Sequence, residues 1–229
     1  KVSTIEKTVR VDEKILNFFQ TRKKLLNKIK KNKINLYLNK EFKKNNLIDY
    51  DKVIITTYSN NNNILSNLGI KKISINKYQL VEKILIKLPK EYERKSYVVI
   101  DGNFVCVDPY LGTTYHLLSD VKLSKLETLI SKYPNFYSFK KRYLNKGIIK
   151  NKKVSRFKAF ISNSSKYLPF LQKAKYIGSM FVVRALKINK ENTDERVTSI
   201  NYHNKKIISV FSGKWNNCIY LAKNLNLNK

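Results

Sequence analysis

Residues 136–160 combine two kinds of side chain that suit contact with an unpaired nucleic acid. Lysine and arginine bind phosphate oxygens, and the flat faces of aromatic rings stack on unpaired bases. The alternative interpretation is a solvated basic face above aromatic core residues. Tyr143 and Phe157 are the candidates for base stacking. The basic residues expected to contact RNA here are Lys140, Lys141, Arg142, Lys146, Lys150, Lys152, Lys153, Arg156 and Lys158.

A second basic patch lies near the start of the chain. Asp12 is predicted to cap a helix that continues to about Lys30, because apolar residues recur on one side of it. A basic helix of this kind suits contact with a phosphate backbone, and it equally suits an ordinary exposed helix face. The apolar positions are Ile15, Phe18, Phe19, Leu25, Leu26 and Ile29, and the predicted RNA contacts are Lys23, Lys24, Lys28, Lys30 and Lys31.

The overall charge points to a polyanionic partner. The 229 residues include 47 Lys and Arg against 16 Asp and Glu, which gives a formal net charge of +31. Self-repulsion of this size is relieved by binding phosphates, and nucleic acid is the usual source of phosphate. Lys, Asn and Ile are also the residues of A/T-rich codons, so part of the lysine excess is attributable to genome composition.

The charge is unevenly distributed along the chain. Between Glu127 and Glu191 there are 63 residues without an acid and with 16 Lys or Arg. We therefore expect residues 1–127 to form a mixed α/β scaffold and residues 128–229 to form a strongly basic, RNA-contacting region.

The elements that would position these residues predict an α+β protein. Residues 53–58 are predicted to form a strand, and the asparagines at 60–63 a loop before a short helix at 64–68. A second strand is expected at 70–75. Asn76 is then expected to cap a helix that stops at Pro89. This order gives an N-terminal mixed α/β half.

The remaining elements are mostly predicted strands. Asp101 and Gly102 indicate a hairpin between 98–100 and 104–107, and the Ser124–Glu127 spacing predicts a helix closed by Pro134. A strand at 180–188, a hairpin formed by 197–202 and 206–211, and a last helix after Gly213 give an antiparallel β-β-β-α unit. A basic, aromatic-containing segment joins this unit to the first half.

The residue types needed for catalysis are sparse. Asp101, Asp108 and Asp120 are the carboxylates that a metal-dependent nuclease would need to bring together. His116 and His203 are expected to be structural, and Cys106 and Cys218 are expected to be inert core thiols. No phosphate-cradling or nucleophile motif occurs. We therefore predict no catalytic residue, no metal site and no cofactor.

A small, very basic chain rich in Lys, Asn and Ile and poor in Gly resembles ribosomal proteins encoded in A/T-rich organellar genomes, especially mitochondrial ones. The resemblance covers the whole chain by composition and matches no single ribosomal family. It implies a structural constituent of a mitochondrial ribosome that binds ribosomal RNA and neighbouring ribosomal proteins, without a small-molecule substrate.

Two alternatives remain open from the sequence. The first is an organellar or viral DNA-processing protein such as a divergent endonuclease. The second is a basic assembly subunit of an organellar membrane complex. The first twelve residues lack the apolar stretch of a signal peptide, and no apolar run is long enough to span a bilayer.

Overall fold

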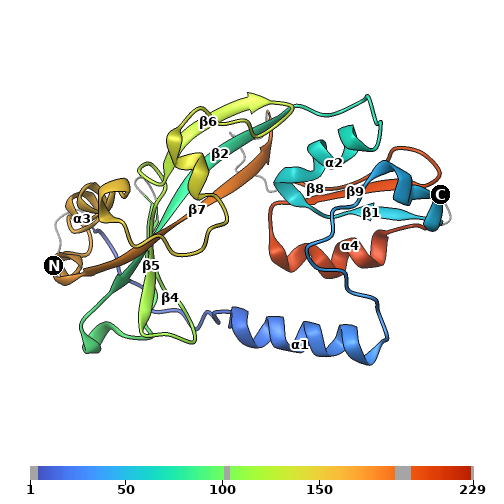
Figure 1. The fold of residues 1–229 in the computed structure, drawn as a ribbon. Coiled ribbons are helices and arrows are strands. Elements are labelled where there is room, and N and C mark those ends of the chain that lie inside the picture. The colour runs from blue at the N-terminus through green and yellow to red at the C-terminus, as the bar shows by residue number, and fades with distance from the viewer. Residues whose placement is uncertain (1–4, 101–103, 189–196, 228–229) are drawn as a thin grey trace. The chain divides into compact units, whose positions relative to one another are not determined.

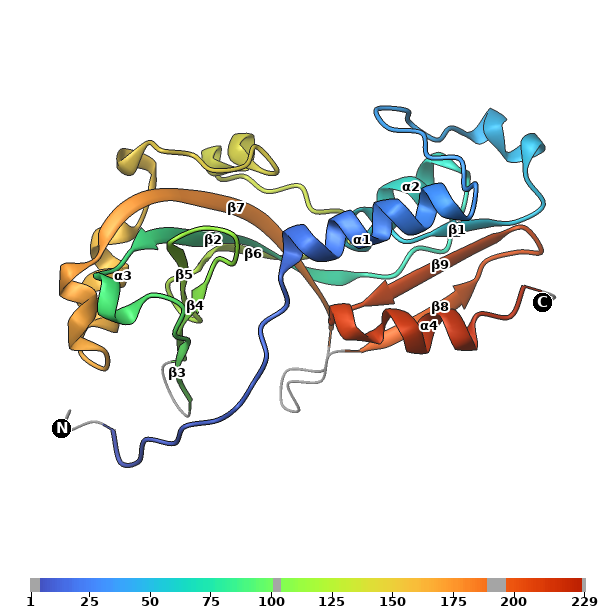
Figure 2. The same ribbon diagram turned by 90° about the horizontal axis from the view of Figure 1, so that it is seen from below.

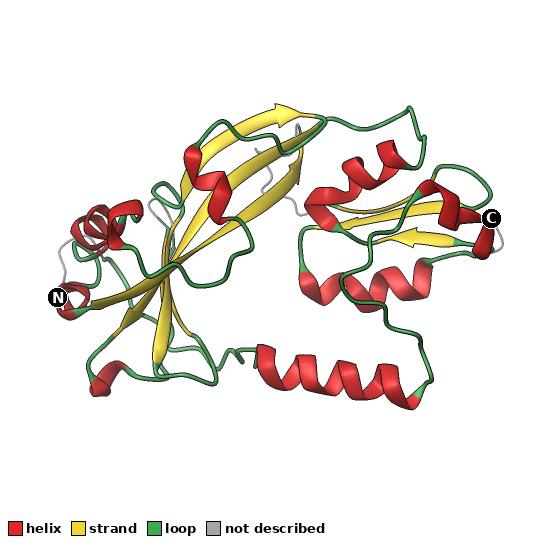
Figure 3. Cartoon of the chain, viewed as in Figure 1, coloured by secondary structure: helices red, strands yellow, loops and turns green. Residues whose placement is uncertain are grey.

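A computed structural model describes residues 5–100, 104–188 and 197–227. It contains both helices and sheets, which confirms the α+β class (Figure 3). The chain forms two compact units, and each is assembled from three segments. Unit 1 comprises Lys1–Leu38, Val81–Leu126 and Phe139–Val182, and unit 2 comprises Asn39–Leu80, Glu127–Ser138 and Val183–Lys229. The structure therefore shows no single division at residue 127, and both predicted regions contribute to both units.

The larger sheet has six strands, β2 (Asn76–Lys87), β3 (Tyr97–Val99), β4 (Val105–Pro109), β5 (Tyr115–Asp120), β6 (Lys125–Ser131) and β7 (Lys175–Lys187). Its order is β3-β4-β5-β2-β6, and β7 also pairs with β2 (Figure 1). The predicted hairpin is confirmed by antiparallel pairing of Val98 with Cys106. Its turn residues, Asp101 and Gly102, lie outside the described residues.

The predicted helix at 76–89 is wrong, because this segment forms strand β2. Leu80, Ile84, Leu85 and Ile86 are all fully buried. A strand that is covered on both faces has apolar residues at nearly every position, so its sequence shows no alternation that would distinguish it from a buried helix. The strand expected at 70–75 is absent. These residues are irregular and lead into β2, which begins at Asn76.

The predicted helix after Ser124 is also wrong, since residues 125–131 form strand β6. Ser124 instead belongs to the turn between β5 and β6. Its Oγ accepts a hydrogen bond of 3.2 Å from the backbone N–H of Asp120, and its own N–H donates to the Asp120 carbonyl at 2.8 Å. The Ser–Glu spacing is therefore a turn signal here and not a helix cap.

The core of unit 1 lies between the sheet and helix α3 (Phe157–Ser164). Phe160 is fully buried and packs with Ile84 and Leu118 from the central strands. Both views place α3 at one end of these strands (Figures 1 and 2). Apolar burial of this kind supplies most of the driving force for folding.

Unit 2 contains a three-stranded sheet of β1 (Val53–Ile55), β9 (Ile207–Ser212) and β8 (Thr198–Tyr202), in that order. The predicted hairpin of β8 and β9 is confirmed, and β1 pairs with β9 in parallel. Helices α2 (Asn61–Asn67) and α4 (Cys218–Asn224) lie on opposite sides of the sheet (Figure 1). The order β7-β8-β9-α4 matches the predicted β-β-β-α, but β7 pairs with β2 in the larger sheet.

Two asparagines of the run at 60–63 are buried, although the run was expected to be a loop. Asn61 Nδ2 donates to the Val210 carbonyl at 2.8 Å. Asn62 Nδ2 donates to the carbonyls of Ser74 and Lys132, each at 2.7 Å. These amides satisfy backbone groups inside unit 2, which is the requirement for burying polar atoms. They are therefore structural residues of α2.

Helix α1 spans Phe18–Lys31 and begins later than predicted. Its cap is Asn17 and not Asp12, because the Asn17 side chain accepts a hydrogen bond from the N–H of Gln20 at 3.1 Å. None of its residues is buried. Short 3₁₀ helices occur at Lys44–Asp49, Tyr58–Asn60, Lys90–Tyr92, Phe139–Tyr143, Lys152–Val154, Pro169–Lys173 and Trp215–Asn217. Within the described ranges, no helix has both the length and the apolar character needed to cross a bilayer.

Candidate nucleic-acid interface and an apolar pocket

The basic segment of residues 139–158 is held against strand β7 in unit 1. Leu144 forms an isolated β-bridge with Phe181, and Ile149 forms another with Ser179. The second bridge has two hydrogen bonds. The N–H of Ile149 donates to the Ser179 carbonyl at 2.8 Å, and the N–H of Ser179 donates to the Ile149 carbonyl at 2.9 Å. Figure 2 shows the segment running beside β7. Backbone pairing thus attaches the segment to β7, and most of its basic side chains are exposed.

Most of the predicted phosphate contacts are accordingly accessible. Exposed members of the segment are Lys141, Arg142, Lys146, Lys150, Lys152, Lys153 and Lys158. The sequence between Glu127 and Glu191 contains no carboxylate that would neutralise them. They form a cationic surface on a backbone that is fixed to the sheet.

Arg156 and Phe157 do not fit the predicted roles. The Arg156 guanidinium donates from Nη1 to the carbonyls of Leu123 and Lys125, both at 3.2 Å, so it joins the segment to the β5–β6 turn. Phe157 is only 8 % exposed and belongs to the core of unit 1. We correct both to structural residues. Lys140 is half-buried, and burial lowers the pKa of its ammonium group, while the nearby Glu82 carboxylate opposes that shift and Arg156 adds to it.

The attachment depends on a buried carboxylate that the sequence analysis missed. Glu82 is fully buried in β2. Its Oε1 accepts hydrogen bonds from Ser155 Oγ at 2.6 Å and Ser179 Oγ at 2.7 Å, and its Oε2 accepts one from the N–H of Arg156 at 3.2 Å. A lone acid inside the apolar run of β2 was the available signal, because a buried carboxylate requires such donors.

Aromatic residues near the segment differ in how accessible they are. Tyr143 is half-buried, with its ring 5.5 Å from that of Phe181 and the Arg142 guanidinium carbon 4.8 Å from its centroid. Arg142 Nη2 also donates to the Tyr143 hydroxyl at 2.8 Å. A base would therefore meet an arginine-covered ring here. Phe139, which was not expected to stack on a base, is 56 % exposed, and the same Arg142 guanidinium carbon lies 5.5 Å from its ring centroid.

The five predicted lysines of α1 are all exposed, as a solvated helix face requires. The helix contains Arg22 in addition and no acidic residue. Cations in its last turn, Lys28, Lys30 and Lys31, also suit the negative end of the helix dipole.

Asp108 and Asp120, two of the three carboxylates considered for a nuclease, do not converge. Val105 of β4 is directly opposite Asp120 of β5, and Asp108 lies three residues further along β4. Since successive side chains of a strand alternate, Asp108 and Asp120 point to opposite faces of the sheet. Asp120 is buried and accepts bonds from the N–H groups of Lys122 and Leu123 at 2.9 and 2.8 Å. Asp101 lies outside the described residues, and the described part holds no metal-ligating group of three His, Cys, Asp or Glu.

The histidines and cysteines occupy different environments. His116 is buried, and burial lowers its pKa. Burial also lowers the pKa of His203, whose Nε2 lies 2.8 Å from Ser209 Oγ. Cys106 is half-buried, and burial raises the pKa of its thiol. Cys218 is exposed, which corrects its expected place in the core.

Unit 2 contains an apolar pocket of about 570 Å³ between its sheet and α4. Ile54 and Val210 provide the sheet side and Leu221 the helix side. Trp215 stands at the pocket and is 61 % exposed. Thr56, Tyr58 and Ser212 also line the pocket and carry hydroxyl groups. The lining residues are Ile54, Thr56, Tyr58, Val210, Ser212, Gly213, Lys214, Trp215, Cys218, Leu221, Ala222 and Leu225.

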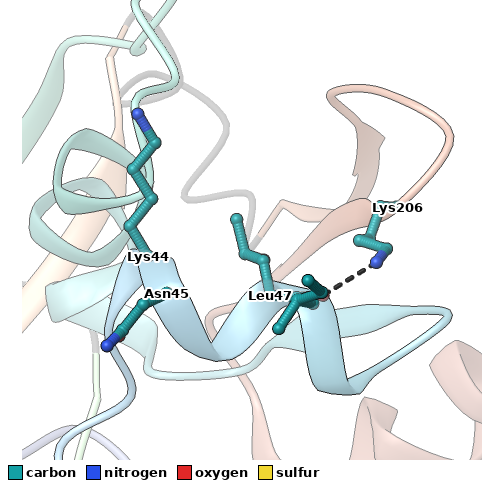
Figure 4. A pocket seen from close by; sticks show the side chains of 5 residues that line it. Lys44, Asn45, Leu47 and Lys206 are labelled. Atoms are coloured by element: carbon teal, nitrogen blue, oxygen red, sulfur yellow. Dashed lines mark hydrogen bonds between the residues drawn. The ribbon is translucent and has the colours of Figure 1, made fainter.

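A second hollow in unit 2, of about 890 Å³, is lined by Lys44, Asn45, Leu47, Ile48 and Lys206. Its polar side chains do not face a common point. Lys206 Nζ donates to the Leu47 carbonyl at 2.7 Å, and Lys44 and Asn45 point away from each other (Figure 4). This arrangement does not form a binding site.

Comparison with known proteins does not assign the chain to a family. No family model matches the chain, and no curated protein matches it. The chain is similar to the crystal structure of iminodiacetate oxidase (IdaA) from Chelativorans sp. BNC1, with a TM-score of 0.43 and 13 % sequence identity over 71 % of this chain. This chain spans 37 % of the length of that protein.

Proposed function

We propose that the protein binds RNA through the exposed lysines and arginine of residues 139–158. The observation that supports this proposal is the attachment of an acid-free, cationic segment to β7 by the Glu82 hydrogen bonds and the Ile149–Ser179 bridge. A fixed backbone reduces the ordering cost when each side chain binds a phosphate. Phe139 is 56 % exposed, and together with the Arg142 guanidinium over its ring it provides an accessible aromatic group for a neighbouring base.

The finer proposal is a structural constituent of a mitochondrial ribosome, which binds ribosomal RNA and neighbouring ribosomal proteins. Its support is composition alone, namely the net charge of +31 and the excess of Lys over acids. In a density gradient of organelle extract, the protein should comigrate with a ribosomal subunit and leave it after ribonuclease treatment. Migration as a light species in both conditions would reject the ribosomal assignment and leave RNA binding to the next test.

The RNA proposal predicts a salt dependence that is concentrated in the segment. We expect binding of single-stranded RNA to weaken with salt, with a log–log slope of roughly 0.7 per phosphate contact. Changing Lys141, Lys146, Lys150, Lys153 and Lys158 together to Gln should reduce that slope by about 2–4. Fluorescence anisotropy with a labelled oligonucleotide between 50 and 300 mM salt measures it.

A charge-matched variant provides the control. Lys71, Lys72, Lys205, Lys214 and Lys223 are exposed residues of unit 2, and their change to Gln removes the same charge elsewhere. This control should alter the slope by less than about 1. Equal losses in the two variants would show that binding is diffuse and would overturn the assignment to the segment.

A second candidate function is binding of a small, ring-containing apolar molecule in the pocket of unit 2. The observation that favours it is the volume of about 570 Å³, within the range of ligand sites, beside Trp215 and Tyr58. Trp215 is the one tryptophan of the chain, so its emission reports on this pocket.

The neutral probe N-phenyl-1-naphthylamine should quench Trp215 emission in a saturable way. Ala222 lines the pocket and is exposed, so Ala222→Phe should occupy part of it and weaken the probe at least tenfold. The exposed Ala159 of α3, changed to Phe, is the matched control and should have no effect. Quenching that does not saturate, or that is equal in both variants, would reject this pocket.

A further inference from the structure

Helix α1 has an apolar face that the RNA proposal does not use. At 100° per residue, Phe18, Phe19, Leu25, Leu26 and Ile29 fall within an arc of about 120°. Phe18 is 59 % exposed, Phe19 46 % and Leu25 50 %. The helix contacts unit 1 through Phe19, whose ring lies 5.7 Å from that of Tyr110. Phe18, Phe19 and Leu25 of this apolar face are therefore accessible in the described structure.

The rest of the helix surface is cationic. Lys23, Lys24, Lys28, Lys30 and Lys31 lie outside the apolar arc, and the helix has no acidic residue. Arg22 falls within the arc by the same geometry, and its long apolar stem allows the guanidinium to reach the polar boundary. Ile15 and Leu16 extend the apolar surface before the cap and are 41 % and 54 % exposed.

An anionic lipid surface complements both parts of this helix. Lipid headgroup phosphates attract the lysines, and the boundary with the acyl chains receives the phenylalanines and leucines. RNA would neutralise the cations but would leave the apolar arc in water, and an acidic protein groove would need no such excess of charge. The 14 residues of α1 extend about 21 Å, which is short of the roughly 30 Å bilayer core.

We propose that α1 is an interfacial helix that lies in the surface of membranes containing anionic phospholipids. The inference is independent of the proposed RNA function, because it rests on exposed apolar side chains of one helix and not on residues 139–158. It places the protein at a membrane face and requires no spanning segment.

Flotation of the full chain with vesicles tests this proposal. We expect binding to vesicles of phosphatidylcholine with 30 % phosphatidylserine and little binding to phosphatidylcholine alone. The double variant Phe18→Gln/Leu25→Gln keeps every charge and should reduce the partition coefficient at least tenfold. Both side chains are half or more exposed, so the fold should persist, and circular dichroism checks it.

Ile48 and Ile219 are exposed residues of unit 2 and provide the matched control. Ile48→Gln/Ile219→Gln should change the partition coefficient less than twofold. Absence of binding to the anionic vesicles would overturn the proposal, and so would binding that the α1 variant leaves unchanged. A fall in RNA affinity for the α1 variant without a fall in vesicle binding would assign this face to RNA instead.

Discussion

Glu82→Ala is expected to lower the free energy of unfolding by about 3–5 kcal/mol, because it leaves buried donors unpaired and creates a cavity. The Glu82 carboxylate accepts hydrogen bonds from the hydroxyls of Ser155 and Ser179 and from the N–H of Arg156. It is fully buried, so water does not replace it without opening unit 1. Urea unfolding followed by circular dichroism measures the loss.

The loss should be localised as well as large. Hydrogen exchange of residues 149–156 should accelerate in Glu82→Ala more than exchange of unit 2, because the carboxylate attaches that segment. Ser155→Ala removes one donor and should cost about 1 kcal/mol. The exposed Glu91, changed to Ala, serves as the control and should alter stability by less than about 0.5 kcal/mol. A cost below about 1 kcal/mol for Glu82→Ala would show that the bonds do not anchor the segment.

Local signals predicted the hairpins well. The Asp101–Gly102 and His203–Asn204 dipeptides each lie between short runs of β-forming residues, and both pairs of strands are present. Residues close together in the sequence determine these hairpins, so the local sequence pattern is sufficient to predict them. The same holds for the last helix, which follows Gly213 as expected.

Long-range packing set the elements that were mispredicted. Residues 76–87 form a strand because β5 and β7, which come from distant segments, pair with it, and most of its side chains on both faces are buried. The pairing of Val53 with Ile207 joins residues that lie far apart in the sequence, so no local sequence pattern indicates it. The three-segment composition of each unit follows from such pairings and was not predictable from charge distribution.

In the candidate interface, too, some features follow from local chemistry and others from long-range packing. Exposure of lysines such as Lys146 and Lys153 follows from their chemistry, because a long charged side chain is rarely buried. Arg156 has the same charge but donates to backbone carbonyls at the β5–β6 turn. Charge counting cannot separate these cases, since the difference lies in which carbonyls the fold brings near the side chain.

Gly178 determines how closely the basic segment approaches β7. Replacing it should show how much the attachment of the segment to β7 contributes, because the charge of the protein is unchanged. A Cβ at Gly178 would lie 2.4 Å from Ile148 Cγ2 and 3.1 Å from the Ile149 carbonyl oxygen. Gly178→Val should therefore cost about 1–3 kcal/mol and should displace the Ile149–Ser179 bridge. Urea unfolding gives the cost, and hydrogen exchange at Ile149 reports the displacement.

RNA binding by the same variant gives the sharper result, because Gly178→Val changes no charge. If the fixed backbone contributes to affinity, the dissociation constant should rise about tenfold, which corresponds to about 1.4 kcal/mol, while the salt slope stays near its original value. Ala159→Val adds bulk at an exposed site of α3 and should leave the dissociation constant unchanged. An unaltered affinity in Gly178→Val, with the bridge demonstrably lost, would mean that the lysines act as a diffuse charge and that their attachment to β7 serves the fold alone.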